Sequence, residues 1–258
     1  MKRLGIATII LILVFSSLMI FYALFFMGGE APPNELKAAI IDNVSLDPRF
    51  NNETFRNQVK TILEQVNFSR VDYYGPNDVT IDLYRKLPSL GYDLILLRIH
   101  SSTLDQTDVC FFSSEDFSLN VLYSKYKDIG QYLVKASTTI AGENRSFFGV
   151  KPSFFKEYAN SEFNGKTIII AMGCDSLLTS SMAEAFISKK ALLYLGWDGK
   201  VYPPETDSNT IILLKRFFLE NKTIKESVSG LFDKLTYAEL DYFPSEFSNL
   251  KFNEWLGG

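Results

Sequence analysis

The stretch "GYDLILLRIHSS" (residues 91–102) is an apolar run that ends on the single histidine of a 258-residue chain. A second run, "GKTIIIAMGCDS" (residues 165–176), is equally apolar and ends on a glycine and a cysteine. Strands that are apolar on both faces are typical of the middle of a parallel sheet that helices cover on both sides. The two stretches therefore predict an α/β fold with reactive side chains at two strand ends.

Strand-like and helix-like segments alternate from Leu36 onward. Strands are expected at 36–44, 70–75, 92–100, 166–174 and 191–198. Helices are expected at 53–66, 79–90, 177–190, 210–220 and 223–235. This alternation predicts a three-layer α/β sandwich with a mostly parallel central sheet.

Residues 103–165 interrupt the alternation between the two quoted strands. A short strand at 108–114, a helix at 122–136 and a hairpin around residues 142–144 are expected there. These features predict an insertion of antiparallel strands beside the main sheet. The tail, residues 242–258, has no regular pattern and is expected to be irregular.

The N-terminus has the length and composition of a membrane anchor. Residues 4–27 contain no charged residue, and a run of about 20 apolar residues crosses a bilayer. A cleaved signal peptide is the alternative, but its apolar region usually spans only about 7 to 15 residues. Lys2 and Arg3 flank this segment on its N-terminal side, whereas residues 28–35 on the other side contain no basic residue. This asymmetry predicts a short cytoplasmic N-terminus at 1–3, a linker at 28–35 and an extracytoplasmic domain at 36–258. We therefore expect a single-pass protein of the cell membrane.

Charge and glycosylation signals agree with this location. The chain has 26 basic and 30 acidic residues, so it offers no basic excess for binding nucleic acid. Five N-x-[ST] triplets are candidate glycosylation sites, although such triplets also arise by chance. They begin at Asn43, Asn52, Asn67, Asn144 and Asn221.

His100 and Cys174 each lie at the end of a predicted central strand. Ligands of open parallel sheets bind outside the carboxyl ends of the strands. If the two strands are neighbours, imidazole and thiol emerge at the same edge of the sheet. A thiol becomes a strong nucleophile when a base takes its proton, and histidine can supply that base.

The pattern resembles the caspase-like cysteine peptidases, which include caspases, legumains, gingipains and CHAT domains. An apolar run ending in histidine and small residues is followed, about 70 residues later, by an apolar run ending in Gly-Cys. The resemblance continues through "GCDSLLTSSMAEAFISKKALLYLGWDGKV" (residues 173–201), where a helix, a turn and a strand follow the cysteine. In order of elements it covers roughly residues 36 to 235.

The resemblance implies a caspase-like sandwich in which Cys174 is the nucleophile and His100 transfers protons. It also implies an oxyanion hole formed by the backbone N–H groups of Cys174 and of the residue after the histidine. That residue is Ser101, where these families usually have glycine. Three residues near strand ends are weak candidates for a substrate pocket, namely Asp175, Trp197 and Asp198.

Structural roles compete with the catalytic ones. A histidine at a strand end is often a hydrogen-bonded structural residue, and Cys174 could form a disulfide with the other cysteine, Cys110. Asp42 is either a carboxylate at the edge of the site or a turn former, of which we favour the turn. The glycines beside Trp197 fit a tight turn as well as a pocket wall.

Two functions are consistent with these observations. The first is a membrane-anchored extracytoplasmic endopeptidase that hydrolyses peptide or protein substrates with a Cys174–His100 dyad. The second is a catalytically inactive caspase-like module that binds a partner at the cell surface, which the serine at position 101 favours. No cofactor and no metal site are predicted, because one histidine and two separated cysteines form no spaced ligand set. The sequence does not indicate an oligomeric state.

Overall fold

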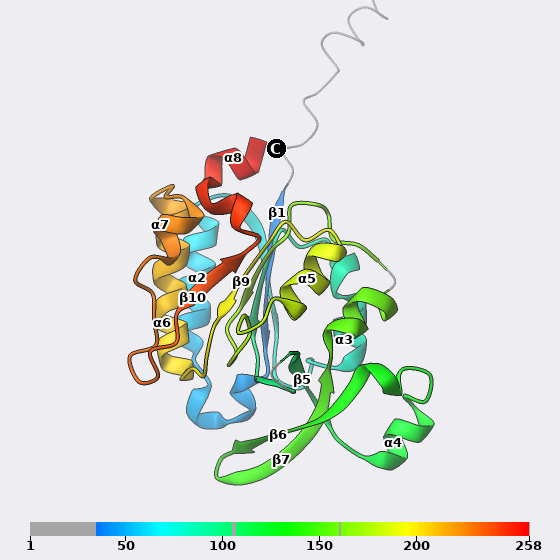
Figure 1. Cartoon of the computed structure of the whole chain (residues 1–258). Helices are drawn as coiled ribbons and strands as arrows, with labels where there is room; N and C mark the ends of the chain where they lie inside the picture. Colours follow the sequence, from blue (N-terminus) through cyan, green and yellow to red (C-terminus); the bar gives the residue numbers. More distant parts are fainter. Residues whose placement is uncertain (1–34, 105–106, 160, 258) are drawn as a thin grey trace, which may run out of the picture. The chain divides into compact units, whose positions relative to one another are not determined.

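A six-stranded sheet forms the centre of the fold in the computed structural model, which describes residues 35–104, 107–159 and 161–257. Its strands lie in the order β10-β9-β8-β3-β1-β2, and all neighbours are parallel except the β10–β9 pair (Figure 1). The strands are β1 (Leu36–Asp42), β2 (Phe68–Tyr74), β3 (Leu94–Arg98), β8 (Ile168–Ala171), β9 (Leu193–Trp197) and β10 (Leu240–Phe243). The prediction of a mostly parallel α/β sheet is confirmed.

The central strands are apolar on both faces because each face is buried. Along β3, Ile95 and Leu97 join one apolar core, whereas Leu94 and Leu96 join the other. This alternation is the period of two that a strand imposes. All five residues of β3 are buried.

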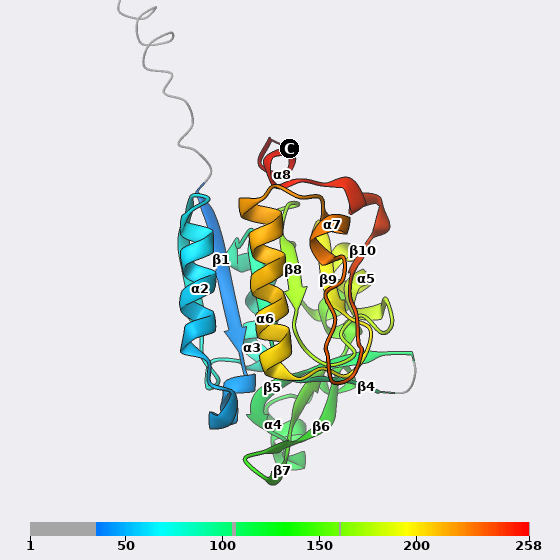
Figure 2. The same cartoon turned by 90° about the vertical axis from the view of Figure 1, so that its left-hand side faces the viewer.

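Helices cover both faces of this sheet (Figures 1 and 2). One face packs against α2 and α6, with α7 beside them, and the opposite face packs against α3 and α5. The helices are α2 (Glu53–Glu64), α3 (Ile81–Lys86), α4 (Leu119–Ser124), α5 (Ser181–Ser188), α6 (Pro203–Leu214), α7 (Ile224–Val228) and α8 (Phe252–Gly257). Shorter helical turns are η1 (Val44–Leu46), η2 (Pro48–Phe50), η3 (Leu87–Leu90), η4 (Gly130–Tyr132), η5 (Phe154–Tyr158), η6 (Lys215–Leu219) and η7 (Ser245–Asn249).

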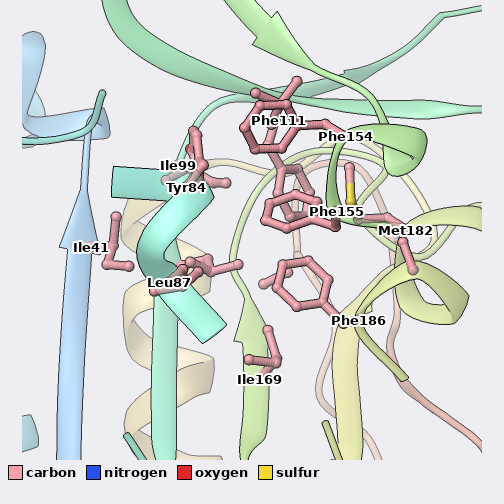
Figure 3. Packing of buried hydrophobic residues seen from close by; sticks show 14 of the residues in the cluster. Ile41, Tyr84, Leu87, Ile99, Phe111, Phe154, Phe155, Ile169, Met182 and Phe186 are labelled. Atoms are coloured by element: carbon pink, nitrogen blue, oxygen red, sulfur yellow. The ribbon is translucent and has the colours of Figure 1, made fainter. Parts of the chain in front are cut away.

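Aromatic side chains fill the core on the α3–α5 side of the sheet (Figure 3). Phe186 of α5 lies between Phe155 and Tyr194, with ring centroids 4.5 and 5.8 Å away. Phe155 in turn meets Tyr84 of α3 edge to face. Offset and edge-to-face pairs of this kind add to the stabilisation that burial provides. The high phenylalanine and tyrosine content of the chain is therefore used largely for packing.

The insertion between β3 and β8 forms a separate antiparallel sheet of four strands in the order β4-β5-β7-β6. These strands are β4 (Ser101–Thr103), β5 (Val109–Asp116), β6 (Leu133–Ile140) and β7 (Glu143–Val150). The predicted hairpin is confirmed, since β6 and β7 pair along their whole length around Ala141 and Gly142, both at positive φ. The predicted helix at 122–136 is wrong over most of its length, because α4 ends at Ser124 and residues 133–136 begin β6, whose Ala136 packs in a small core with Cys110 and Phe147.

The C-terminal part also differs from expectation. The tail is not wholly irregular, since β10 adds an antiparallel edge strand to β9, and α8 follows. The helix predicted at 223–235 ends at Val228, shortly before Gly230 at a φ of 69°. The predicted anchor, residues 4–27, lies outside the described residues. Within the part of the chain that is described, no helix is long and apolar enough to cross a membrane.

A buried arginine joins the carboxyl ends of β1 and β3 to α6. Arg98 makes five hydrogen bonds, two to Asp207 (2.7 and 2.9 Å), one to Asp42 (2.9 Å), one to Ser45 Oγ (3.2 Å) and one to the Phe50 carbonyl (2.8 Å). A guanidinium has five N–H donors, so all of them are used. The side chains of Arg98, Asp42 and Asp207 are at most 5% exposed.

Replacing Arg98 should destabilise the protein strongly. In Arg98→Met the carboxylates of Asp42 and Asp207 stay buried without their cation, which costs about 3–5 kcal/mol. The measurement is urea unfolding followed by circular dichroism. Arg70→Met is the matched control, because Arg70 is 63% exposed in its pair with Asp72 and should change stability by less than about 1 kcal/mol. Equal, small effects of both substitutions would contradict this account.

Candidate active site

The two reactive residues follow neighbouring strands. β3 pairs with β8 in parallel, with Leu97 opposite Ala171, and the Met172 N–H still donates to the Leu97 carbonyl at 2.8 Å. His100 lies two residues beyond the end of β3, and Cys174 lies three beyond the end of β8. The expected meeting of the two strand ends at one edge of the sheet is therefore observed.

His100 and Cys174 line the same cavity, whose volume is about 220 Å³. Its wall is largely apolar and is formed by Val44, Phe50, Ile99, Met172, Val201 and Pro203. Thr206 of α6 and Thr138 and Thr139 of β6 add hydroxyl groups. A larger hollow of about 390 Å³ lies between α2 and η6, but neither histidine nor cysteine lines it. The smaller cavity is therefore the candidate active site.

Cys174 presents a neutral thiol to this cavity. Its Sγ accepts a hydrogen bond from the Val201 N–H at 3.4 Å, and the residue is only partly exposed. Burial raises the pKa of the Cys174 thiol, and this effect outweighs the opposing contributions of the Val201 N–H and of nearby Lys200. The thiol therefore needs a base to take its proton before it can attack.

His100 is held through its backbone N–H, while one ring nitrogen is buried without a partner among the described residues. The His100 backbone N–H donates to Asn43 Oδ1 at 2.8 Å, and Asn43 Nδ2 donates to the Phe112 carbonyl at 2.6 Å. The ring Nε2 is buried and has no hydrogen-bond partner among the described residues. Burial, together with the positive charge of Arg98, lowers the pKa of His100 to about 4. The imidazole is therefore neutral at pH 7, and its protonated form is disfavoured in this environment.

Ser101 and Gly173 fix the loop that presents the cysteine. Ser101 Oγ donates to the Cys174 carbonyl at 2.6 Å. A Cβ on residue 173 would lie 2.2 Å from Ser101 Oγ and 2.5 Å from the Ile99 carbonyl oxygen, so only glycine fits there. The serine thus has a structural role in the position where the resembling families usually have glycine.

The two backbone N–H groups expected to form the oxyanion hole belong to Cys174 and Ser101. No hydrogen bond in the described chain joins the Cys174 N–H to another residue. The Phe112 N–H donates to the His100 carbonyl just before the β4–β5 ladder begins, whereas the His100 N–H donates to Asn43. In such a ladder the next residue, Ser101, directs its N–H away from the partner strand.

The three weak pocket candidates do not line the cavity. Trp197 is fully buried in the core on the α2–α6 side. The Asp175 carboxylate is buried and forms an ion pair with Lys200. Asp198 is exposed, and its Oδ1 accepts the Glu239 N–H at 2.7 Å beside β10. The structure therefore brings together His100, Cys174 and Ser101 but not these three.

Three contributors were missed by the sequence reasoning. Asn43 was considered only as a glycosylation triplet, yet its amide positions His100. Arg98 looked like part of an apolar strand, although a charged residue inside "LILLRIH" signals a buried partner. Asp42 does form the expected turn by accepting the Ser45 N–H at 3.0 Å, and it is also an ion-pair partner of Arg98. Thr139 of β6 lay beyond the end of the expected helix, and nothing in the sequence linked it to the site.

Neither cysteine is in a disulfide, and the five glycosylation triplets differ in accessibility. Cys110 and Cys174 are both free thiols. Asn43 is fully buried and therefore not a glycosylation site in the folded protein. Asn52 caps α2 and donates to Asp207, and Asn221 accepts the Asn253 N–H. The two remaining triplets begin at exposed side chains, Asn67 and Asn144.

Metal ligands and known relatives do not add to this picture. Among the residues that the structure describes, no three His, Cys, Asp or Glu side chains are grouped so that they could hold a metal ion. Comparison with models of known protein families gives no match, and no curated protein is significantly similar in sequence. The function must therefore be argued from the geometry of the site.

The His100 ring should titrate far below the usual range. Because the chain has one histidine, its ring protons give a single set of NMR signals. We expect a midpoint of about pH 4 in the folded protein and about 6.5 in concentrated urea. The folded state then binds fewer protons than the unfolded chain between these values, so the free energy of unfolding falls as pH decreases from 6.5 to 4. A folded-state midpoint near 6.5 would show that the ring is solvated and not buried.

Proposed function

We propose that the protein is a membrane-anchored, extracytoplasmic cysteine endopeptidase of the caspase-like class. The observation that supports this most directly is that His100 and Cys174, more than 70 residues apart in sequence, follow adjacent parallel strands and line one cavity. The mostly parallel sheet with helices on both faces is consistent with the sandwich that the resemblance implies.

The reaction starts from the neutral pair. His100 Nε2 takes the thiol proton as Cys174 Sγ attacks the carbonyl carbon of the scissile peptide. The resulting oxyanion is stabilised by two backbone N–H groups. That of Cys174 makes no hydrogen bond to another described residue, and that of Ser101 is directed away from β5. The imidazolium then protonates the departing amine, and an acyl-enzyme remains. Water, deprotonated by His100, hydrolyses the thioester and regenerates the thiol.

The cellular location rests on the N-terminal segment and on the accessible triplets. Residues 4–27 would anchor the chain through one helix, with the domain from residue 36 onward outside the cytoplasm. Asn67 and Asn144 are exposed and would be open to glycosylation on that side. The partners in this proposal are the membrane and a peptide or protein substrate.

The alternative is a binding module that has lost turnover. The observation that favours it is that burial keeps both the thiol and the imidazole neutral, so no thiolate–imidazolium pair is preformed. In that case the cavity would hold a peptide without cleaving it. The peptidase function predicts that a thiol-directed probe labels Cys174, whereas the binding module predicts no labelling.

Replacing Cys174 should abolish proteolysis. The assay uses the purified full-length protein, fluorescein-labelled casein, and a peptidyl acyloxymethyl ketone as a thiol-directed probe. We expect Cys174→Ala to reduce casein hydrolysis to background and to prevent labelling. We expect His100→Ala to lower kcat by about 10²- to 10⁴-fold, because general-base assistance is lost.

Cys110→Ala is the matched control, since Cys110 is a free thiol buried away from the cavity. It should retain hydrolysis and labelling. Hydrolysis that persists in Cys174→Ala would refute the peptidase mechanism. A wild-type protein that neither cleaves casein nor reacts with the probe would favour the binding module.

A further inference from the structure

The antiparallel sheet ends in a long strand with an open edge. In the order β4-β5-β7-β6, β6 is an edge strand, and the strand it pairs with among the described residues is β7. β4 forms the opposite edge, but it has only three residues. β6 has eight, from Leu133 to Ile140, which is enough to pair with an extended peptide. An unpaired edge of this length is a template for another strand.

The register determines which backbone groups of β6 are free. The hairpin turns through two residues, and Ile140 lies opposite Glu143. In such a hairpin the residues flanking the turn form a hydrogen-bonded pair, and the pairs alternate from there. The N–H and C=O groups of Thr139 and Ser137 therefore point away from β7. No hydrogen bond to these groups from outside the hairpin is found in the described chain.

The open edge leads into the candidate active site. Thr138 and Thr139 line the same cavity as His100 and Cys174. Figure 1 shows the β6–β7 hairpin crossing beneath the carboxyl ends of the parallel strands, where both reactive residues emerge. The hairpin tip is fixed there, because the Ala141 N–H donates to Asp47 Oδ2 at 2.9 Å and Asp47 is itself buried and paired with Arg49.

The side chains along the edge suit a ligand recognised by its main chain. Lys135, Ser137 and Thr139 are exposed, and Lys135 is the single charged residue of β6. Small hydroxyl side chains leave room for a neighbouring strand and do not select one particular sequence. Pairing of this kind derives affinity from backbone hydrogen bonds, whereas pockets for alternate side chains provide specificity.

We propose that an extended segment of the substrate polypeptide adds to the sheet as a fifth strand along β6, with its backbone bonded to the Thr139 N–H and C=O. This addition positions the scissile peptide at Cys174. The inference rests on the proposed peptidase function and assigns the binding mode of its substrate.

The test removes one backbone donor of the edge. Thr139→Pro deletes an N–H that faces away from β7, so the β6–β7 ladder loses no hydrogen bond. Thr139→Ala, the matched control, removes the side chain but keeps the N–H. We expect Thr139→Pro to raise KM for fluorescein-labelled casein about tenfold over Thr139→Ala, because a substrate carbonyl loses its partner. Iodoacetamide modification of Cys174 should proceed at the same rate in both.

A second experiment uses the wild-type protein and varies the substrate peptide instead. After the casein cleavage site is identified by mass spectrometry, synthetic peptides spanning it carry one N-methylated amide each. We expect cleavage to weaken at alternate positions, since alternate amides of an added strand face β6. Equal KM for the two variants, or equal cleavage of all N-methylated peptides, would overturn the proposed addition of the substrate along β6.

Failure of the peptidase function would be recognised separately by casein binding to the Cys174→Ala variant. If adding Thr139→Pro to Cys174→Ala weakens casein binding, polypeptide binding along β6 is supported even when the wild-type chain does not cleave casein. If casein binding does not change with Thr139→Pro, polypeptide binding along β6 is refuted.

Discussion

The site depends on the charge network around Arg98. This one guanidinium joins the end of β3 to Asp42 at the end of β1, to Asp207 on α6 and to the carbonyl of Phe50 in the β1–α2 connection. The same elements supply much of the cavity wall. A buried cation with two carboxylates is costly unless every donor and acceptor is satisfied. Here Ser45 and Tyr73 donate to Asp42 Oδ2, which Arg98 does not reach, and Asn52 adds a further bond to Asp207 Oδ2. The geometry of the site is therefore tied to complete satisfaction of this network.

The network also sets the chemistry of His100. Arg98 is two residues before the histidine, and its positive charge adds to burial in disfavouring the imidazolium. Asp42 and Asp47 oppose this effect but do not outweigh it. The thiol is likewise kept neutral by burial. The proposed mechanism therefore requires the proton to move from Cys174 to His100 as the sulfur attacks a bound carbonyl carbon, because neither charged form is favoured beforehand.

The parts of the fold that could be predicted are those in which local pattern and burial agree. The runs around Ile95 and Ile169 are apolar on both faces, so they were recognised as central strands, and their neighbouring positions followed from the parallel arrangement. The first four residues of β6 (133–136) were expected to be helical, and their strand conformation comes from pairing with β7. β10 has only four residues, and its existence depends on the edge that β9 offers.

The reactive pair could be predicted for the same reason, but its surroundings could not. His100 and Cys174 end recognisable strands, whereas the pocket candidate Trp197 belongs to a strand buried on both faces and packs in the core. Asn43 reaches the site through hydrogen bonds to His100 and to Phe112 of β5, and Thr139 reaches it because the hairpin folds over the cavity. Those contacts leave no local signal in composition or periodicity.

The central claim, that Cys174 becomes acylated with the help of His100, is tested most directly by mass spectrometry of the intermediate. The full-length protein is mixed with casein, quenched in acid within milliseconds to seconds, and digested. The account predicts an acyl adduct on the peptide that contains Cys174, at much lower occupancy in His100→Ala. Casein hydrolysis without any adduct on Cys174, or an adduct whose formation does not depend on His100, would contradict it.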